Sequence, residues 1–144
     1  LYEVKAGGTS IWERWDALRP DGTVNLGKDS GSGLVNTVGG GMVSFNHYAN
    51  GAVGDWLYRR VAGLEAIEPG YKKFKVVPLV GGGLTSVSCF KKLSSGTIKI
   101  NWNFENGVFV LSINVPFNTS AVITLPDGKS FEVSSGKYVY SVEM

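Results

Sequence analysis

Cysteine and histidine are the scarcest chemically reactive residues in this sequence, with one of each among 144 residues. The single cysteine, Cys89, excludes an internal disulfide framework and a cysteine-based metal site. Because it lies in an apolar alternating run, we expect a buried and unreactive thiol. One histidine, His47, cannot by itself provide a conventional zinc site, because such a site takes several nitrogen or sulfur ligands. The sequence therefore predicts no metal site and no cofactor.

Long apolar runs and clusters of like charge are also lacking. No run approaches the roughly 20 apolar residues of a membrane span, and no signal peptide opens the chain. The formal net charge is +2, and the lysines are scattered along the second half, as on the solvated faces of alternating strands. We therefore expect neither a membrane nor a nucleic acid as partner.

The first residue, Leu1, stands in the middle of an apolar–polar pattern. We expect the chain to be a fragment of a longer protein, so the missing signal peptide indicates no location. A cytoplasmic, periplasmic or secreted parent protein remains open.

Glycine is abundant, and its placement divides the chain. Residues 1–42 contain several breakers of regular structure, among them Gly7-Gly8 and Pro20-Asp21-Gly22. In the second of these, proline presets one turn dihedral and glycine accepts a positive φ. We predict loops laid over a scaffold, which is where binding and catalytic groups tend to lie.

Residues 45–64 form the one clear predicted helix, because apolar residues recur there at spacings of three and four. Ser44 is the expected N-cap, and Asp55 and Arg59 are one turn apart and can pair. Gly51 and Gly54 lower helix propensity, which indicates close packing against a neighbouring element. No second strong helix covers the apolar face, so we expect a missing barrel or bundle.

After Glu68-Pro69-Gly70 the apolar period becomes two, and about seven short strands follow. Asn106-Gly107 is the strongest hairpin signal among their connections. Regular strands with one apolar face each predict a small antiparallel β-sandwich. The fold class expected is mixed and mainly β, with a loop and helix segment at 1–68 and the sandwich at 69–144.

The strongest candidate for a catalytic segment is Trp12-Glu13-Arg14-Trp15-Asp16. Indole faces stack on sugar rings, and a carboxylate beside them can hold a water against a sugar carbon. A structural alternative is that Glu13 is a surface carboxylate paired with Arg14. For Asp16 we favour the start of a turn, and for Arg14 a supporting ion pair.

The second cluster, Ser44-Phe45-Asn46-His47-Tyr48, follows about thirty residues later. His47 lies on the first turn of the predicted helix, where its side chain projects into the cleft that the helix end faces. A hydrogen bond to a sugar hydroxyl and a buried structural role are both open.

These motifs together resemble the C-terminal end of the bacterial α-L-rhamnosidases of glycoside hydrolase family 78. The resemblance extends through nearly the whole chain and rests on the following segments: residues 9–16, 44–49 and 51–58, Pro69-Gly70-Tyr71-Lys72, Val115-Pro116 with Asn118-Thr119, Leu125-Pro126 and Ser135-Gly136. It implies the last segment of an (α/α)6 catalytic barrel followed by a C-terminal β-sandwich.

The same resemblance implies roles for single residues. Glu13 matches the general base of an inverting hydrolysis, His47 matches a histidine lining the rhamnose pocket, and Trp12 and Trp15 match the family motif. The substrates implied are rhamnose-containing glycosides or polysaccharides. The family's general acid lies upstream of Leu1, so we expect the isolated chain to be inactive.

The alternative to the enzyme fragment is a stand-alone β-sandwich module that binds carbohydrate or mediates association. The apolar helix face should be covered either by the sandwich or, in a homodimer, by a second copy of the chain.

Overall fold

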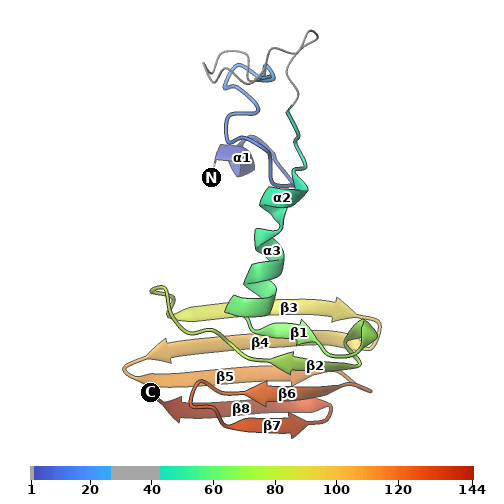
Figure 1. Ribbon diagram of the computed structural model, residues 1–144, viewed down its shortest axis with the longest axis vertical. Coiled ribbons are helices and arrows are strands. Elements are labelled where there is room, and N and C mark those ends of the chain that lie inside the picture. Colours follow the sequence, from blue (N-terminus) through green and yellow to red (C-terminus); the bar gives the residue numbers. More distant parts are fainter. Residues whose placement is uncertain (1, 27–42) are drawn as a thin grey trace. The chain divides into compact units, whose positions relative to one another are not determined.

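A computed structural model describes residues 2–26 and 43–144, and the chain divides into two compact units, Leu1–Gly54 and Asp55–Met144 (Figure 1). The run Gly39-Gly40-Gly41-Met42, which we interpret from the sequence as a flexible segment before the helix, lies outside the described residues. So do residues 27–38 of the segment 18–38, whose role the motifs do not reveal. The domain bounds 1–68 and 69–144 stay a prediction.

Residues 2–26 and 43–54, the described part of the first unit, have little regular structure, as predicted. Helix α1 spans Tyr2–Lys5, and an antiparallel bridge joins Leu18 to Val24. Between these two residues, Pro20-Asp21-Gly22 forms the expected turn, with Gly22 at a φ of 84° and its N–H donating to the Arg19 carbonyl at 2.9 Å. Short-range turns thus shape this part of the chain.

The predicted helix is shorter than 45–64 and consists of three successive pieces. Helix α2 spans Tyr48–Gly51, α3 spans Val53–Trp56, and a π-helical turn, η1, spans Leu57–Val61. The Asp55–Arg59 pair is confirmed, with Arg59 Nε donating to Asp55 Oδ2 at 2.7 Å. The N-cap is His47 rather than Ser44, because the His47 side chain accepts the Asn50 N–H.

Most of the helical surface is exposed. Only Val61 is buried, whereas Trp56 and Leu57 are 51% and 48% exposed. A Cβ atom built at Gly51 or Gly54 meets open space among the described residues. The close packing inferred from these two glycines is therefore not found within this part of the chain.

The second unit is a sandwich of two four-stranded sheets (Figure 1). The strands are β1 (Leu64–Ala66), β2 (Lys73–Val76), β3 (Ser86–Leu93), β4 (Gly96–Glu105), β5 (Val108–Val115), β6 (Ser120–Thr124), β7 (Ser130–Val133) and β8 (Gly136–Glu143), with a 3-10 turn η2 (Pro69–Tyr71) before β2. The sheet orders are β1-β2-β6-β7 and β3-β4-β5-β8.

The sandwich prediction is confirmed, with two corrections. Strand β1 was missed, because Leu64 was assigned to the helix. The pair β2–β6 is parallel, with Phe74 opposite Ala121, while the remaining pairs are antiparallel. The expected Asn106-Gly107 hairpin joins β4 to β5, and both residues have a positive φ, 52° and 77°, as a type I′ turn requires.

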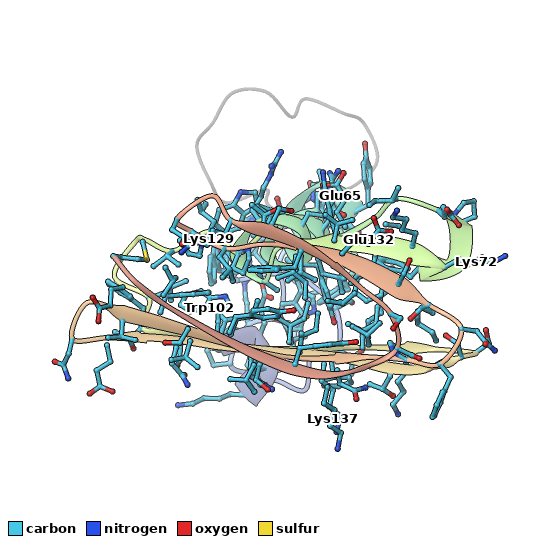
Figure 2. All side chains as sticks on the ribbon, turned by 90° about the horizontal axis from the view of Figure 1, so that it is seen from below. Glu65, Lys72, Trp102, Lys129, Glu132 and Lys137 are labelled. Atoms are coloured by element: carbon cyan, nitrogen blue, oxygen red, sulfur yellow. The ribbon has the colours of Figure 1, made fainter. Side chains whose placement is uncertain are left out.

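The core lies between the two sheets because one residue in two along each central strand points inward. On β5 the inward residues Phe109, Leu111 and Ile113 are at most 1% exposed. Figure 2 shows Trp102 of β4 between the layers. Its indole N–H donates to the Val61 carbonyl at 3.0 Å, which fixes the end of η1 to the sandwich core.

Candidate active site

The two sequence clusters that were predicted to form the site lie against each other in the first unit. The Glu13 N–H donates to the Ser44 carbonyl at 2.8 Å, and the His47 N–H donates to the Ile11 carbonyl at 2.9 Å. The Ser10 hydroxyl donates to the Phe45 carbonyl at 2.6 Å. Three hydrogen bonds to backbone carbonyls thus hold the two segments, which are about 30 residues apart in the sequence, against each other.

The Glu13 side chain is exposed, and its orientation is fixed. Its Oε2 accepts the Ser44 N–H at 2.8 Å. Glu13 and Ser44 are therefore joined by two hydrogen bonds, one through the Glu13 backbone N–H and one through its side-chain carboxylate. A carboxylate held in this way can accept a proton from a bound water. The alternative pairing with Arg14 is not observed, because that guanidinium is directed to Asp16.

Arg14 and Asp16 form a bidentate pair beside Glu13. Arg14 Nε and Nη2 donate to the two Asp16 oxygens at 3.1 and 3.0 Å, and Asn25 Nδ2 donates to Asp16 Oδ2 at 2.8 Å. The hydrogen bond from Arg14, with its positive charge and the Asn25 amide, holds the pKa of Asp16 below its usual value. Asp16 is therefore anionic at neutral pH and unsuited to act as a proton donor.

The two tryptophans have opposite environments. Trp12 is 5% exposed, packs edge-on against Phe45 with ring centroids 5.1 Å apart, and lies over Gly8. Trp15 is 77% exposed. The structure thus makes Trp12 part of the small core of the first unit and leaves only Trp15 with an accessible indole face.

His47 is half-buried and stacks on Tyr48 with ring centroids 6.1 Å apart. Its Nδ1 accepts the Asn50 N–H at 3.3 Å. In the neutral imidazole the ring proton therefore lies on Nε2, which can donate to a ligand. This geometry combines the structural and the binding interpretations: one nitrogen caps a helix, and the other is a donor.

Asn50 is a residue that the sequence reasoning missed. Its side-chain Nδ2 donates to the carbonyls of Trp12 and Glu13 at 3.1 and 3.3 Å, while its backbone N–H contacts His47. The sequence signal is weak: Asn50 is one of several polar residues near the helix start. Only the approach of the two segments reveals its partners.

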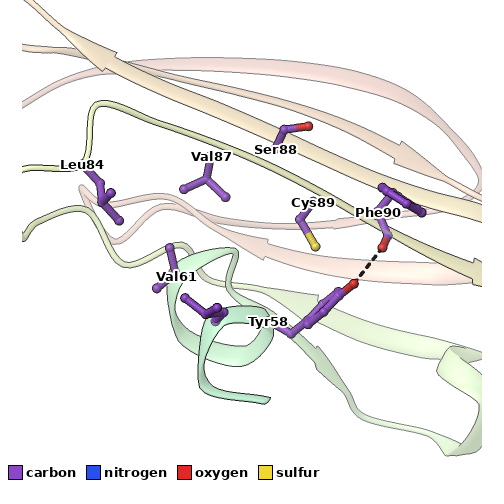
Figure 3. A pocket seen from close by; sticks show the side chains of 8 residues that line it. Tyr58, Val61, Leu84, Val87, Ser88, Cys89 and Phe90 are labelled. Atoms are coloured by element: carbon purple, nitrogen blue, oxygen red, sulfur yellow. Dashed lines mark hydrogen bonds between the residues drawn. The ribbon is translucent and has the colours of Figure 1, made fainter. Parts of the chain in front are cut away.

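The second unit contains a cavity of about 440 Å³ between η1 and β3. Figure 3 shows the Tyr58 hydroxyl donating to the Phe90 carbonyl across it, at 3.2 Å, with Cys89 beside them. The lining is mostly apolar, and partial burial raises the pKa of the Cys89 thiol above its usual value. Neither feature suits sugar hydrolysis, and the expectation of an unreactive cysteine fits this pKa shift.

Residues 2–26 and 43–144 contain no group of three histidine, cysteine or acidic side chains placed to hold a metal ion. No helix within these same ranges combines the length and apolarity needed to cross a membrane.

Comparison with known protein families shows which family the chain belongs to. A family model described as the bacterial alpha-L-rhamnosidase C-terminal domain matches residues 63–140, more than half of the chain. The chain belongs to the bacterial α-L-rhamnosidase family. A second model, the bacterial alpha-L-rhamnosidase 6 hairpin glycosidase domain, matches residues 1–61 of this rhamnosidase-family chain, which include the site around Glu13.

Individual relatives agree with this assignment. An alpha-L-rhamnosidase of Streptomyces avermitilis is 32% identical over 98% of the chain, and one of Formosa agariphila is 33% identical over 90%. The chain spans only 14% and 13% of the lengths of these two proteins.

Solved rhamnosidase structures share the fold. That of native alfa-L-rhamnosidase from Aspergillus terreus aligns with a TM-score of 0.73 and 36% identity, over 98% of this chain and 15% of that one. The Streptomyces avermitilis alpha-L-rhamnosidase complexed with L-rhamnose aligns with a TM-score of 0.71 and 30% identity, over 99% of this chain and 14% of that one.

Proposed function

We propose that this chain is the C-terminal part of an inverting α-L-rhamnosidase and that Glu13 is its general base. The observation that carries the proposal is the Glu13 carboxylate, exposed to solvent yet fixed by the Ser44 N–H at 2.8 Å. The match of residues 1–61 to a glycosidase domain favours this function over a stand-alone binding module. The L-rhamnose complex of the Streptomyces relative supports rhamnosides as the substrate class.

In the proposed reaction Glu13 removes a proton from a water molecule. The water oxygen attacks the anomeric carbon of the rhamnosyl group from the face opposite the glycosidic oxygen. The glycosidic bond breaks as a second carboxylic acid protonates the leaving oxygen, and the sugar is released with inverted configuration. Such paired carboxyl groups stand about 6.5–9.5 Å apart. The low pKa of Asp16 makes it unsuitable as this acid, so we assign the acid to another part of the protein.

The neighbours of Glu13 have separate roles in this proposal. Trp15, with its exposed indole, stacks on the substrate, and His47 donates from Nε2 to a sugar hydroxyl. Trp12 contributes to substrate binding indirectly. It is buried against Phe45 and fixes the backbone next to Glu13.

Glu13→Gln tests the base in the enzyme that contains this chain. The glutamine carbonyl can still accept the Ser44 N–H, so the geometry is kept while the proton acceptor is lost. We expect kcat for an aryl α-L-rhamnoside to fall by about 10²–10⁴. Added azide, which needs no deprotonation, should restore turnover and yield a rhamnosyl azide of inverted configuration. A kcat within about tenfold of the unmodified enzyme would show that Glu13 is not the base.

The first-formed sugar anomer tests the stereochemistry independently. Proton NMR during hydrolysis should detect the β-anomer of L-rhamnose before it equilibrates. Initial release of the α-anomer would instead indicate a retaining reaction, in which the carboxylate pair is closer, about 5–5.5 Å.

The isolated 144-residue chain is expected to be inactive, since it supplies one carboxylate of the two. Purified chain incubated with an aryl α-L-rhamnoside should release no more phenol than buffer does. Hydrolysis that disappears in the Glu13→Gln variant would contradict this expectation and would place a complete site within the chain.

A further inference from the structure

The outer faces of the two sheets differ in how their lysines are neutralised. On the β1-β2-β6-β7 sheet and its turn, Lys73, Lys75 and Lys129 each form an ion pair, with Glu132 at 2.6 Å, Glu65 at 3.1 Å and Asp127 at 2.9 Å respectively. On the β3-β4-β5-β8 sheet, Lys99 and Lys137 form no ion pair with the described part of the chain. Figure 2 shows Lys137 directed away from Trp102 and the core, on the face opposite Glu65, Glu132 and Lys129.

Lys99 and Lys137 lie in one row across neighbouring strands. Lys99 is opposite Asn114, which is in turn opposite Lys137. Strand spacing places the two lysine backbones about 9.5 Å apart. The next row on the same face holds Asn101 and Ser112. Both ammonium groups can therefore reach a single ligand laid across this face.

This face is hollowed into a groove. A depression of about 580 Å³ covers the row of Lys99 and Lys137, and one of about 390 Å³ lies at the end of the sandwich beside Phe117. The two depressions share Thr97, Asn114 and Lys137, so they adjoin and are together called the groove; no aspartate or glutamate lines either of them. The groove has the size of a ligand site and a purely positive charge.

The polar groups of the groove are fixed before any ligand binds. Asn114 Nδ2 donates to the Thr97 carbonyl at 2.7 Å, and Asn101 Oδ1 accepts from the Ser88 hydroxyl at 2.8 Å. At one end Phe117 is 80% exposed, which gives the groove an accessible aromatic face. Oriented amides, hydroxyls and an exposed ring suit a sugar chain, and the lysines suit carboxylate or sulfate groups on it.

We propose that the groove on the β3-β4-β5-β8 sheet binds an acidic polysaccharide, at a site separate from the one around Glu13. Lys99 and Lys137 contact the anionic groups, Asn101 and Asn114 contact hydroxyls, and Phe117 stacks on one sugar ring. Charge complementarity selects this partner, because a neutral glycan makes no use of the two lysines. The site does not depend on hydrolysis, so its failure would leave the proposed enzyme function unaffected.

The test is affinity electrophoresis of the full chain through gels containing polygalacturonate, dextran sulfate, neutral dextran, polyglutamate or polyuridylate. We expect retardation by polygalacturonate, dextran sulfate or both, which distinguishes uronate from sulfate as the anion. Neutral dextran should cause none, and polyglutamate and polyuridylate should cause much less. Equal retardation by polyglutamate, stronger retardation by polyuridylate, or none by either acidic polysaccharide overturns the proposal.

Matched variants locate the site. Replacing Lys99 and Lys137 by glutamine should weaken binding by about tenfold, since two charged contacts are lost. The control replaces Lys73 and Lys75 by glutamine, which removes the same net charge from the other sheet and should change binding less than about twofold. Phe117→Ala should weaken binding at constant charge. Circular dichroism verifies that each variant is folded, and equal loss in the lysine control overturns the assignment to this groove.

Discussion

Asn50 connects the two parts of the candidate site through one amide. It donates to the carbonyls of Trp12 and Glu13, so we assign it as a positioning residue for the base. In the enzyme that contains this chain, Asn50→Ala should lower kcat by about 10–100-fold with little change in KM, because a small displacement of Glu13 impairs water activation. Steady-state kinetics with an aryl α-L-rhamnoside measures both constants.

Asn103→Ala is the matched control, since Asn103 is an exposed asparagine of β4 and lies outside the candidate site. It should leave kcat near that of the unmodified enzyme. A double-mutant cycle then separates positioning from general destabilisation. If Asn50 acts through Glu13, Asn50→Ala should add little to the loss already caused by Glu13→Gln. Fully additive losses in kcat would refute the positioning role.

At the level of single residues, the sequence indicated Glu13 and His47 as site candidates but not their contacts. Hydrogen bonds such as Ser44 N–H to Glu13 Oε2 join residues 31 apart, and no local pattern encodes such an approach. The tryptophans illustrate the same limit. A loop has no period from which to tell that Trp12 is buried and Trp15 exposed, so tertiary packing decides the difference.

At the level of elements, Gly63 marks the passage from η1 to the sandwich. It has a φ of 79°, and its carbonyl accepts the Val77 N–H at 2.9 Å. A Cβ atom there would overlap the backbone of Val77 and Pro78. Gly63→Ala should therefore lower the free energy of unfolding by more than about 2 kcal/mol. Urea denaturation followed by circular dichroism measures it.

Gly54→Ala provides the contrast within the preceding helix α3. Its added methyl group meets open space among the described residues, and alanine favours helix. We expect a gain of about 0.5–1 kcal/mol in the free energy of unfolding. If both variants were equally stable, the close approach at Gly63 would have no energetic consequence.

The strands were more predictable than the helix for a physical reason. Alternation and turn residues are local signals, and Asn106-Gly107 needs only its own dihedrals to join β4 to β5. Strand β1 has three residues and follows a helix closely, so its Leu64 fitted the helical period. The parallel pairing of β2 with β6 joins segments more than forty residues apart, which no turn between them could indicate.

At the level of the whole molecule, the fold and family could be inferred from the sequence, whereas a complete active site could not. The chain covers 14% of the length of its Streptomyces relative. It holds a carboxylate suited to be a base, and the low pKa of Asp16 makes this second carboxyl group unsuited to act as the acid. Among residues 2–26 and 43–144, apolar side chains such as Trp56 and Leu57 stay about half exposed.

Exposed apolar side chains on the helix favour self-association of the chain. Trp56 and Leu57 are about half exposed on consecutive helical positions, and a contiguous apolar surface favours burial. We expect the isolated chain to form a homodimer that covers them, detected as twice the monomer mass by light scattering after size exclusion. Trp56→Glu should restore the monomer, because a carboxylate resists desolvation. Val4→Glu, at a residue 71% exposed on α1, should not. A monomer at all concentrations, with both side chains open to solvent, would contradict the expected burial of this helix surface.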